Sequence, residues 1–335
     1  MTKNVKAKHG WDYFYYGNLS SGGPRPGAAT APGTTRERAW YNDAELYKPR
    51  YTQTYFGIRN RIGILVETYS YATFEDRIKS NYWFLEEVID YAARNAEAIR
   101  RATAAADAES IVGKEQAVRG RLVRAPEPVQ IVLADSVEER NPYVPDRPML
   151  RRVKGSERVE TMPHYATLEA TETSIAPRAY VFPAVPPAPG EAPGLMQMGF
   201  GGGRQAPSSP YRDNLAVLNR IADRLAAHGI RFSKTDTPIT VKGERFRIES
   251  SEVEAQEYQG HRIRTLTGKW EPGGQEAPAG SLVVPMDQPL ARLAFLLLDP
   301  RSDDGLMAWG LMDEMLGKTP SPEFYPVIRT MEGVR

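Results

Sequence analysis

A single carboxylate, Glu67, stands at the end of an apolar run and is the clearest candidate for acid–base chemistry. The run is Ile62-Gly63-Ile64-Leu65-Val66, and two basic residues, Arg59 and Arg61, precede it. A short apolar run rich in β-branched residues predicts a strand that is buried on both faces. Ligands of open α/β sheets bind at the carboxyl ends of the strands, so Glu67 is placed where a general base could act. A structural carboxylate paired with a nearby arginine is the alternative interpretation.

The segment that contains Glu67 also carries a family resemblance. Residues 57–71, GIRNRIGILVETYSY, resemble the active-site strand of bacterial zinc carboxypeptidases of the carboxypeptidase A-like metallopeptidase family. The resemblance implies that Glu67 is the general base beside a catalytic zinc and that the substrate is a peptide or a peptide-like amide. Further similar segments are Gly10-Trp11, Tyr41, Pro49-Arg50-Tyr51, the helix after Phe74, and two tail segments, Gln288-Pro289-Leu290 and Asp303-Asp304-Gly305-Leu306.

The resemblance implies substrate-binding residues upstream of Glu67. In the family, a tyrosine and arginines near this point hold the substrate and its C-terminal carboxylate, which makes Tyr41, Arg50 and Arg59 the candidates here. Arginine suits this role because its planar guanidinium binds a carboxylate through two parallel hydrogen bonds. A place on the surface or at a sheet edge is the alternative for each of the three.

The chain departs from the family in its metal ligands. The family binds zinc with a His-x-x-Glu pair and a second histidine, all upstream of the general base, and a catalytic zinc needs three protein ligands. Before Glu67 there is only His9, in His9-Gly10-Trp11-Asp12, and the next histidine is His164. We therefore expect no metal ligands in this chain. Zinc is expected only in the complete enzyme, of which this chain would be an inactive C-terminal fragment.

The elements around Glu67 are predicted from periodicity. Residues 74–101 form the strongest helical signal, with a capping-box-like start at Thr73 and Asp76. Its apolar stripe comprises Ile78, Tyr82, Leu85, Ile89, Ala92, Ala96 and Ile99. We expect this stripe to lie on the strand that ends at Glu67 and to fix the direction of that carboxylate.

The second half of the chain predicts mixed helices and antiparallel strands. Strands are expected at 121–124, 129–134, 179–183, 239–249, 261–270 and 281–285, and helices at 215–225, 290–298 and 306–316. Residues 20–35 and 183–210 read as loops. The glycine run at 201–203 lacks the Lys-Ser/Thr ending of a phosphate-binding loop.

Bulk properties narrow the class of protein. The 43 Lys and Arg nearly balance the 42 Asp and Glu, so the net charge gives no sign of a nucleic-acid partner. Cysteine is absent, which excludes disulfides and thiolate metal sites. No apolar run is long enough for a transmembrane helix, and the first residues show no signal peptide. For the complete protein we expect a periplasmic or secreted location.

These observations predict an α/β chain. Residues 1–105 are expected to be the C-terminal part of a mixed-sheet zinc-carboxypeptidase-like catalytic domain, 106–120 a linker, and 121–335 an α+β accessory domain. The expected function is hydrolysis of peptide bonds. The alternative is a binding or accessory module without catalysis, in which the second half recognises protein or cell-wall material.

Overall fold

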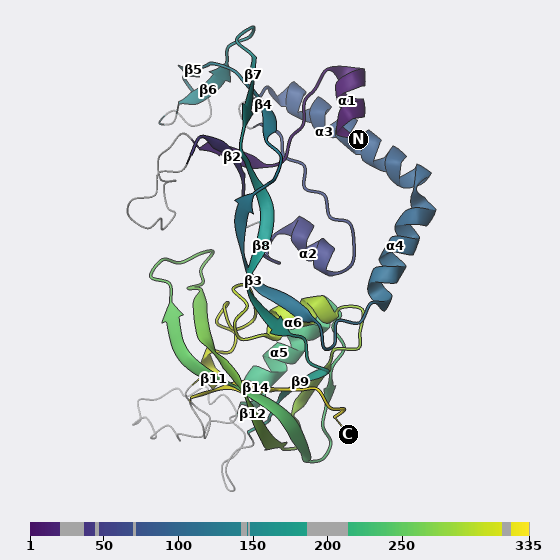
Figure 1. Ribbon diagram of the computed structural model, residues 1–335, viewed down its shortest axis with the longest axis vertical. Helices are drawn as coiled ribbons and strands as arrows, with labels where there is room; N and C mark the ends of the chain where they lie inside the picture. The colour runs from purple at the N-terminus through teal and green to yellow at the C-terminus, as the bar shows by residue number, and fades with distance from the viewer. Residues whose placement is uncertain are drawn as a thin grey trace, which may run out of the picture. The chain divides into compact units, whose positions relative to one another are not determined.

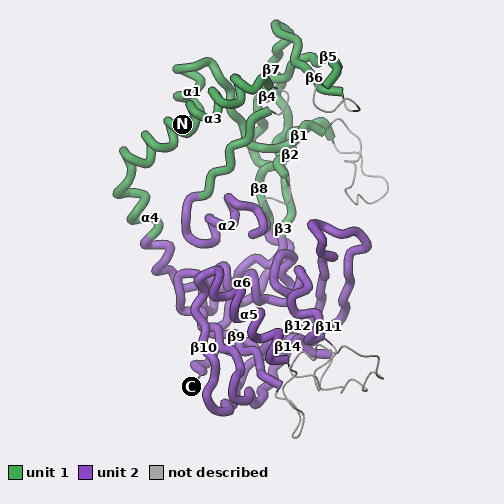
Figure 2. The backbone as a smooth tube through the Cα atoms, turned by 180° about the vertical axis from the view of Figure 1, so that it is seen from behind, with its two compact units in different colours: residues 1–47, 63–103, 120–169 green, residues 48–62, 104–119, 170–335 purple. Residues whose placement is uncertain are grey.

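The structure is a computed structural model of the chain and describes residues 1–20, 37–43, 47–69, 72–141, 146, 148–185, 214–316 and 323–334. The residues divide into two compact units, and each unit is discontinuous in sequence (Figure 2). Unit 1 comprises residues 1–47, 63–103 and 120–169, and unit 2 comprises residues 48–62, 104–119 and 170–335. Helices and several sheets are present, so the expected mixed α/β content is confirmed in its general form.

The helix after Thr73 forms as predicted. It is α3 (Phe74–Arg94), and the hydroxyl oxygen of Thr73 accepts a hydrogen bond from the backbone N–H of Asp76 at 3.2 Å. This bond satisfies one of the N–H groups that a helix leaves unpaired in its first turn. A second helix, α4 (Ala96–Ala108), follows after Asn95.

The buried face of α3 is not the face that its apolar stripe predicted. Helix α1 (Thr2–His9) packs on the face that carries Ser80, Phe84 and Glu87, all of which are buried. The large side chains of the stripe within α3 stay exposed, with exposed fractions of 52% at Ile78, 60% at Tyr82, 53% at Leu85 and 67% at Ile89. The expectation that this stripe is buried against the Glu67 strand is therefore wrong for the described residues.

Polar contacts explain why α1 covers the less apolar face. Asn4 donates a hydrogen bond to Glu87 at 2.8 Å, and Lys8 forms an ion pair with the same carboxylate. The ring of His9 stacks on Trp83 with 4.2 Å between ring centroids. A buried carboxylate is tolerated only when it is paired, and α1 supplies the partners.

Unit 1 contains short sheets. One has the order β1-β2-β8-β3, with β1 and β2 antiparallel and β2 and β8 parallel, and two further hairpins pair β4 with β7 and β5 with β6. The bounds are β1 (Gly17–Ser20), β2 (Ala39–Asn42), β3 (Glu115–Arg124), β4 (Val129–Leu133), β5 (Ser136–Glu139), β6 (Met149–Arg152), β7 (Arg158–Met162) and β8 (His164–Ile175). Strands β3 and β8 contribute residues to both units.

Unit 2 is built on an antiparallel sheet of order β10-β13-β9-β14-β11-β12, in which β11 and β12 form a long hairpin (Figure 1). The bounds are β9 (Ala179–Phe182), β10 (Ser233–Lys234), β11 (Ile239–Val253), β12 (Arg264–Ala277), β13 (Leu282–Pro285) and β14 (Phe324–Thr330). Gly243 in β11 lets β14 approach, because a Cβ atom there would lie 2.2 Å from the carbonyl oxygen of Arg329. The strands expected near 179–183, 239–249, 261–270 and 281–285 are confirmed.

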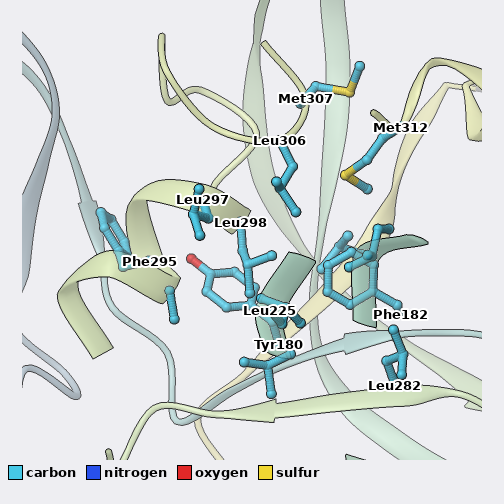
Figure 3. Packing of buried hydrophobic residues seen from close by; sticks show 14 of the residues in the cluster. Tyr180, Phe182, Leu225, Leu282, Phe295, Leu297, Leu298, Leu306, Met307 and Met312 are labelled. Carbon is cyan, nitrogen blue, oxygen red and sulfur yellow. The ribbon is translucent and has the colours of Figure 1, made fainter. Parts of the chain in front are cut away.

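The main hydrophobic core lies in unit 2 (Figure 3). Helices α5 (Leu215–His228) and α6 (Ala291–Leu298) pack their apolar sides against the sheet, and a short helix, α2 (Thr52–Ile58), packs on α6. The buried side chains include Tyr180, Phe182, Leu225, Leu282, Phe295 and Leu298. Gly229 ends α5 in the left-handed conformation, which glycine adopts readily. Residues 306–316 form turns and one 3₁₀ turn, η1 (Asp313–Met315), so the helix predicted there is wrong.

The residues expected to form a linker, 106–120, contain the end of α4 and the beginning of β3. The expected division into a catalytic part and an accessory part stays a prediction. Within the described ranges, no helix combines the length and the apolar character that a membrane crossing requires. Most of the predicted loops, at 21–35 and 186–210, lie outside the described residues.

Candidate functional site

The segment that carries Glu67 does not pair as a strand. Residues 62–69 form neither helix nor strand, and their large apolar side chains are exposed, at 64% for Ile62, 44% for Ile64 and 47% for Leu65. Glu67 is exposed as well. The prediction of a buried strand is therefore wrong for the described structure. The pattern of β-branched residues remains typical of a strand, and what the segment lacks in the described structure is a neighbouring strand on either side.

Tyr41 lies in β2 of unit 1 and stacks on Tyr165 of β8. The ring centroids are 4.3 Å apart and the planes differ by 12°. The Tyr165 hydroxyl donates a hydrogen bond to Glu37 at 2.6 Å, and this bond, together with burial, raises the pKa of Tyr165 to about 12. Tyr41 is thus half-buried on a sheet, and its role toward substrate stays a prediction.

Arg50 holds a carboxylate of its own chain. Its backbone N–H and its Nε each donate to Asp304 at 2.7 Å, and Asp304 is buried. The guanidinium lies over two aromatic rings, 4.9 Å from the centroid of Tyr258 and 4.8 Å from that of Trp309. Trp309 also donates its indole N–H to Asp304 at 2.9 Å. The guanidinium is therefore paired with a carboxylate of its own chain, and its role toward a substrate carboxylate stays a prediction.

Arg59 is held near the C-terminal end of α5. Its Nη1 donates to the carbonyl oxygen of His228 at 2.5 Å and to the hydroxyl oxygen of Tyr55 at 3.1 Å. The Tyr55 hydroxyl is also 2.7 Å from Nδ1 of His228. A cation is favourable at the C-terminus of a helix, where carbonyl groups are left unpaired.

The four predicted site residues are divided between the two units. Glu67 and Tyr41 belong to unit 1, and Arg50 and Arg59 belong to unit 2. The two arginines lie on separate networks, one centred on Asp304 and the other on His228. A chemical role for the four residues together stays a prediction.

The remaining histidines contact neighbouring side chains of the described chain. His9 stacks on Trp83, and Nε2 of His164 lies 3.1 Å from the side-chain oxygen of Asn42. His261 packs edge-on against Trp309, with 5.2 Å between centroids. In the part of the chain that the structure describes, no three His, Asp or Glu side chains are grouped to hold a metal ion. These residues do not fit the His₂Glu zinc site of the resembled family.

Sequence reasoning missed a buried ionic network in unit 2. Asp299 is fully buried directly after α6, and its carboxylate accepts a hydrogen bond from the backbone N–H of Arg301 at 3.0 Å. The Arg301 guanidinium donates to Glu172 at 3.0 Å, and Arg119 approaches the same glutamate at 3.1 Å. Burial raises the pKa of Asp299 even though Arg301 opposes this effect. The sequence signal was Asp299-Pro300-Arg301, charged residues that directly follow an apolar helix.

Comparisons with protein-family models, with curated proteins and with solved structures find no match for this chain.

His228 gives unit 2 an expected pH dependence. Burial, with the nearby charges of Arg59 and Arg224, lowers the pKa of its imidazole below the ordinary value of about 6.5. As the pH falls below that value, the unfolded chain binds a proton before the folded chain does, so the free energy of unfolding decreases. We expect the melting temperature of unit 2 to fall between pH 7.5 and 5, and His228→Gln to weaken this dependence.

The control for this experiment is His164→Gln, because burial lowers the pKa of His164 as well, and that residue belongs to unit 1. The two variants separate the contributions of the two units. An unchanged pH dependence in His228→Gln would contradict the assignment to His228.

Proposed function

We propose that this chain is the C-terminal part of a zinc-carboxypeptidase-like metallopeptidase that hydrolyses peptide bonds, with Glu67 as the general base. The proposal starts from the resemblance of residues 57–71 to the active-site strand of that family. The structural observation that supports it is the uncovered apolar surface of the Glu67 segment and of α3.

Large apolar side chains are exposed both in the Glu67 segment and along α3. Ile64 and Leu65 are exposed in the segment, and five large apolar side chains are exposed at helical spacing along α3. Burial of one such side chain is worth about 1.5–3 kcal/mol, so covering this face with a partner would be favourable by several kcal/mol. A sheet supplied by a preceding part of a peptidase domain would pair the strand-forming segment and cover the stripe.

In this proposal Glu67 acts on the attacking water. Its carboxylate takes a proton from the water molecule and later delivers it to the leaving amine of the peptide. The described structure leaves Glu67 open to solvent, so its carboxylate is accessible to a substrate. Tyr41 remains the candidate for a contact with the substrate.

The zinc ion implied by the resemblance does not fit the described residues, and in the proposal its ligands lie in another part of the complete protein. There the ion would supply Lewis-acid chemistry toward the scissile carbonyl. The roles assigned to this chain are limited to the proton transfer by Glu67 and to substrate contacts.

A binding module without catalysis is the second candidate function. The observation that favours it is the group of exposed aromatic side chains near the N-terminus, with exposed fractions of 46% at Phe14, 69% at Tyr15 and 50% at Tyr16. Exposed aromatic side chains are common at protein-binding surfaces.

The experiment that separates the two functions compares this chain with a longer chain that includes its upstream coding sequence. We expect the longer chain to contain about one zinc per molecule, as a single catalytic site requires, and to release C-terminal residues from peptides in a chelator-sensitive reaction. This chain alone should do neither. Chelator-sensitive release by this chain would overturn the proposal that it is a fragment, and a longer chain without zinc and without turnover would favour the binding module.

A further inference from the structure

The segment of residues 48–62, called the anchor segment below, belongs to unit 2 although it precedes most of that unit by more than 100 positions in the sequence. It contains α2 and ends five positions before Glu67. Tyr55 and Ile58 of α2 pack against the hydrophobic core of unit 2. Polar contacts on both sides of α2 add to this packing.

The first polar contact lies at the start of the anchor segment. Asp304 receives hydrogen bonds from the backbone and the side chain of Arg50, and from the indole of Trp309. The two ionic side chains are almost completely buried, with exposed fractions of 11% for Arg50 and 1% for Asp304. Removing either partner of a buried ion pair destabilises the folded state, because the remaining charge stays buried without a counter-charge.

The second group of contacts lies at the end of the anchor segment. Tyr55 and Arg59 contact His228, the last residue of α5. Asn60 donates to the carbonyl oxygen of Pro289 at 2.9 Å and to Asp107 at 3.1 Å. Asn60 adopts a left-handed backbone with φ of 60°, which asparagine tolerates better than most residues. Arg61 adds two hydrogen bonds to Asp107, at 2.9 and 3.0 Å.

We infer that Asp304 and His228 are positioning residues. They hold the anchor segment on the rest of unit 2 and so fix residue 62, where the chain continues into the Glu67 segment. Arg50 and Arg59 then serve this attachment instead of binding a substrate carboxylate. The attachment itself is independent of the proposed function, and only its consequence for Glu67 rests on that function. An accessory part that holds the segment before a catalytic base contributes to catalysis without touching the substrate.

The attachment is tested by hydrogen exchange on the full chain, with Asp304→Asn and Tyr55→Phe compared with wild type. Because Asp304→Asn leaves Arg50 without its buried counter-charge, the amides of residues 52–62 should exchange faster by about 100-fold or more. Tyr55→Phe removes one hydroxyl and should give a smaller increase in the same amides. The amides of β9 should change less than those of the anchor segment in both variants.

The matched control is Glu271→Gln, which breaks an exposed ion pair with Arg247 elsewhere in unit 2 and should leave the anchor segment unchanged. Unchanged exchange of residues 52–62 in both anchor variants would overturn the inference. An equal increase in β9 and in the anchor segment would overturn it as well, because it would report only a loss of global stability.

The consequence for Glu67 is tested in the longer chain. Asp304→Asn should lower kcat with little change in KM or zinc content, measured at a temperature where the variant remains folded. Unchanged kcat would remove the positioning role but leave the attachment. A longer wild-type chain without turnover would contradict the proposed function, and the hydrogen-exchange comparison would still decide whether unit 2 holds the anchor segment.

Discussion

On the proposed function, turnover of the longer chain is expected to fall by about 10²–10⁴-fold or more in Glu67→Gln, the range that general-base catalysis contributes. The amide keeps the size of the carboxylate but cannot accept the proton of the attacking water. Stability should change little, because Glu67 is exposed and the nearby arginines have other partners, Arg59 at His228 and Arg61 at Asp107. Turnover, zinc content and melting temperature are measured together.

The matched control for this prediction is Glu86→Gln, an exposed glutamate of α3 in the same unit, which should leave turnover unchanged. Retained turnover in Glu67→Gln would remove Glu67 from the mechanism. Loss of zinc together with turnover would make Glu67 a metal ligand instead of a base.

The second large expected effect is on stability, and it differs between the two faces of α3. Two adjacent substitutions, one on each face, measure it. In this chain Phe84→Ala should lower the free energy of unfolding of unit 1 by about 3–5 kcal/mol, because Phe84 is buried against Tyr13 beneath α1. Leu85→Ala should change it by less than about 0.5 kcal/mol, because this side chain is 53% exposed. Native-state hydrogen exchange of the α3 amides measures both values.

In the longer chain the two substitutions should lower the free energy of unfolding by similar amounts. If a preceding sheet covers the stripe, Leu85→Ala should then cost about 2–5 kcal/mol, the usual range for a buried leucine. An equally small effect of Leu85→Ala in both chains would show that the stripe stays exposed in the complete protein and would speak against the peptidase proposal.

Local signals predicted the elements that depend on neighbouring residues in the sequence. The Thr73 cap and the strands near residues 239–249 and 261–270 follow from short-range patterns. The strand at residues 62–66 was predicted from the same kind of pattern, but a strand also needs a partner, and the described structure supplies none. The predicted burial of the α3 stripe was wrong for the same reason, because periodicity identifies an apolar face without identifying what covers it.

The contacts of the candidate site were beyond sequence reasoning because they are distant in sequence. The partner of Arg50 is Asp304, 254 positions later, and the partner of Arg59 is His228, 169 positions later. Glu87 illustrates the opposite limitation, because a carboxylate in the middle of a helix gives no sign that Lys8 and Asn4 allow its burial. The sequence shows the chemical type of each of these residues, but it does not show which distant residue each one contacts.

The position of β14 in the sheet has a consequence for synthesis of the protein. This strand is made after every other strand of the sheet, yet it lies between β9 and β11 in the middle of the sheet. At about 5–20 residues per second, the ribosome needs on the order of ten seconds to proceed from the end of β11 at Val253 to the start of β14 at Phe324. During this interval β9 and β11 each lack a neighbour, and unpaired strand edges are templates for pairing with other chains. A nascent chain that stops before Phe324 would keep both edges open.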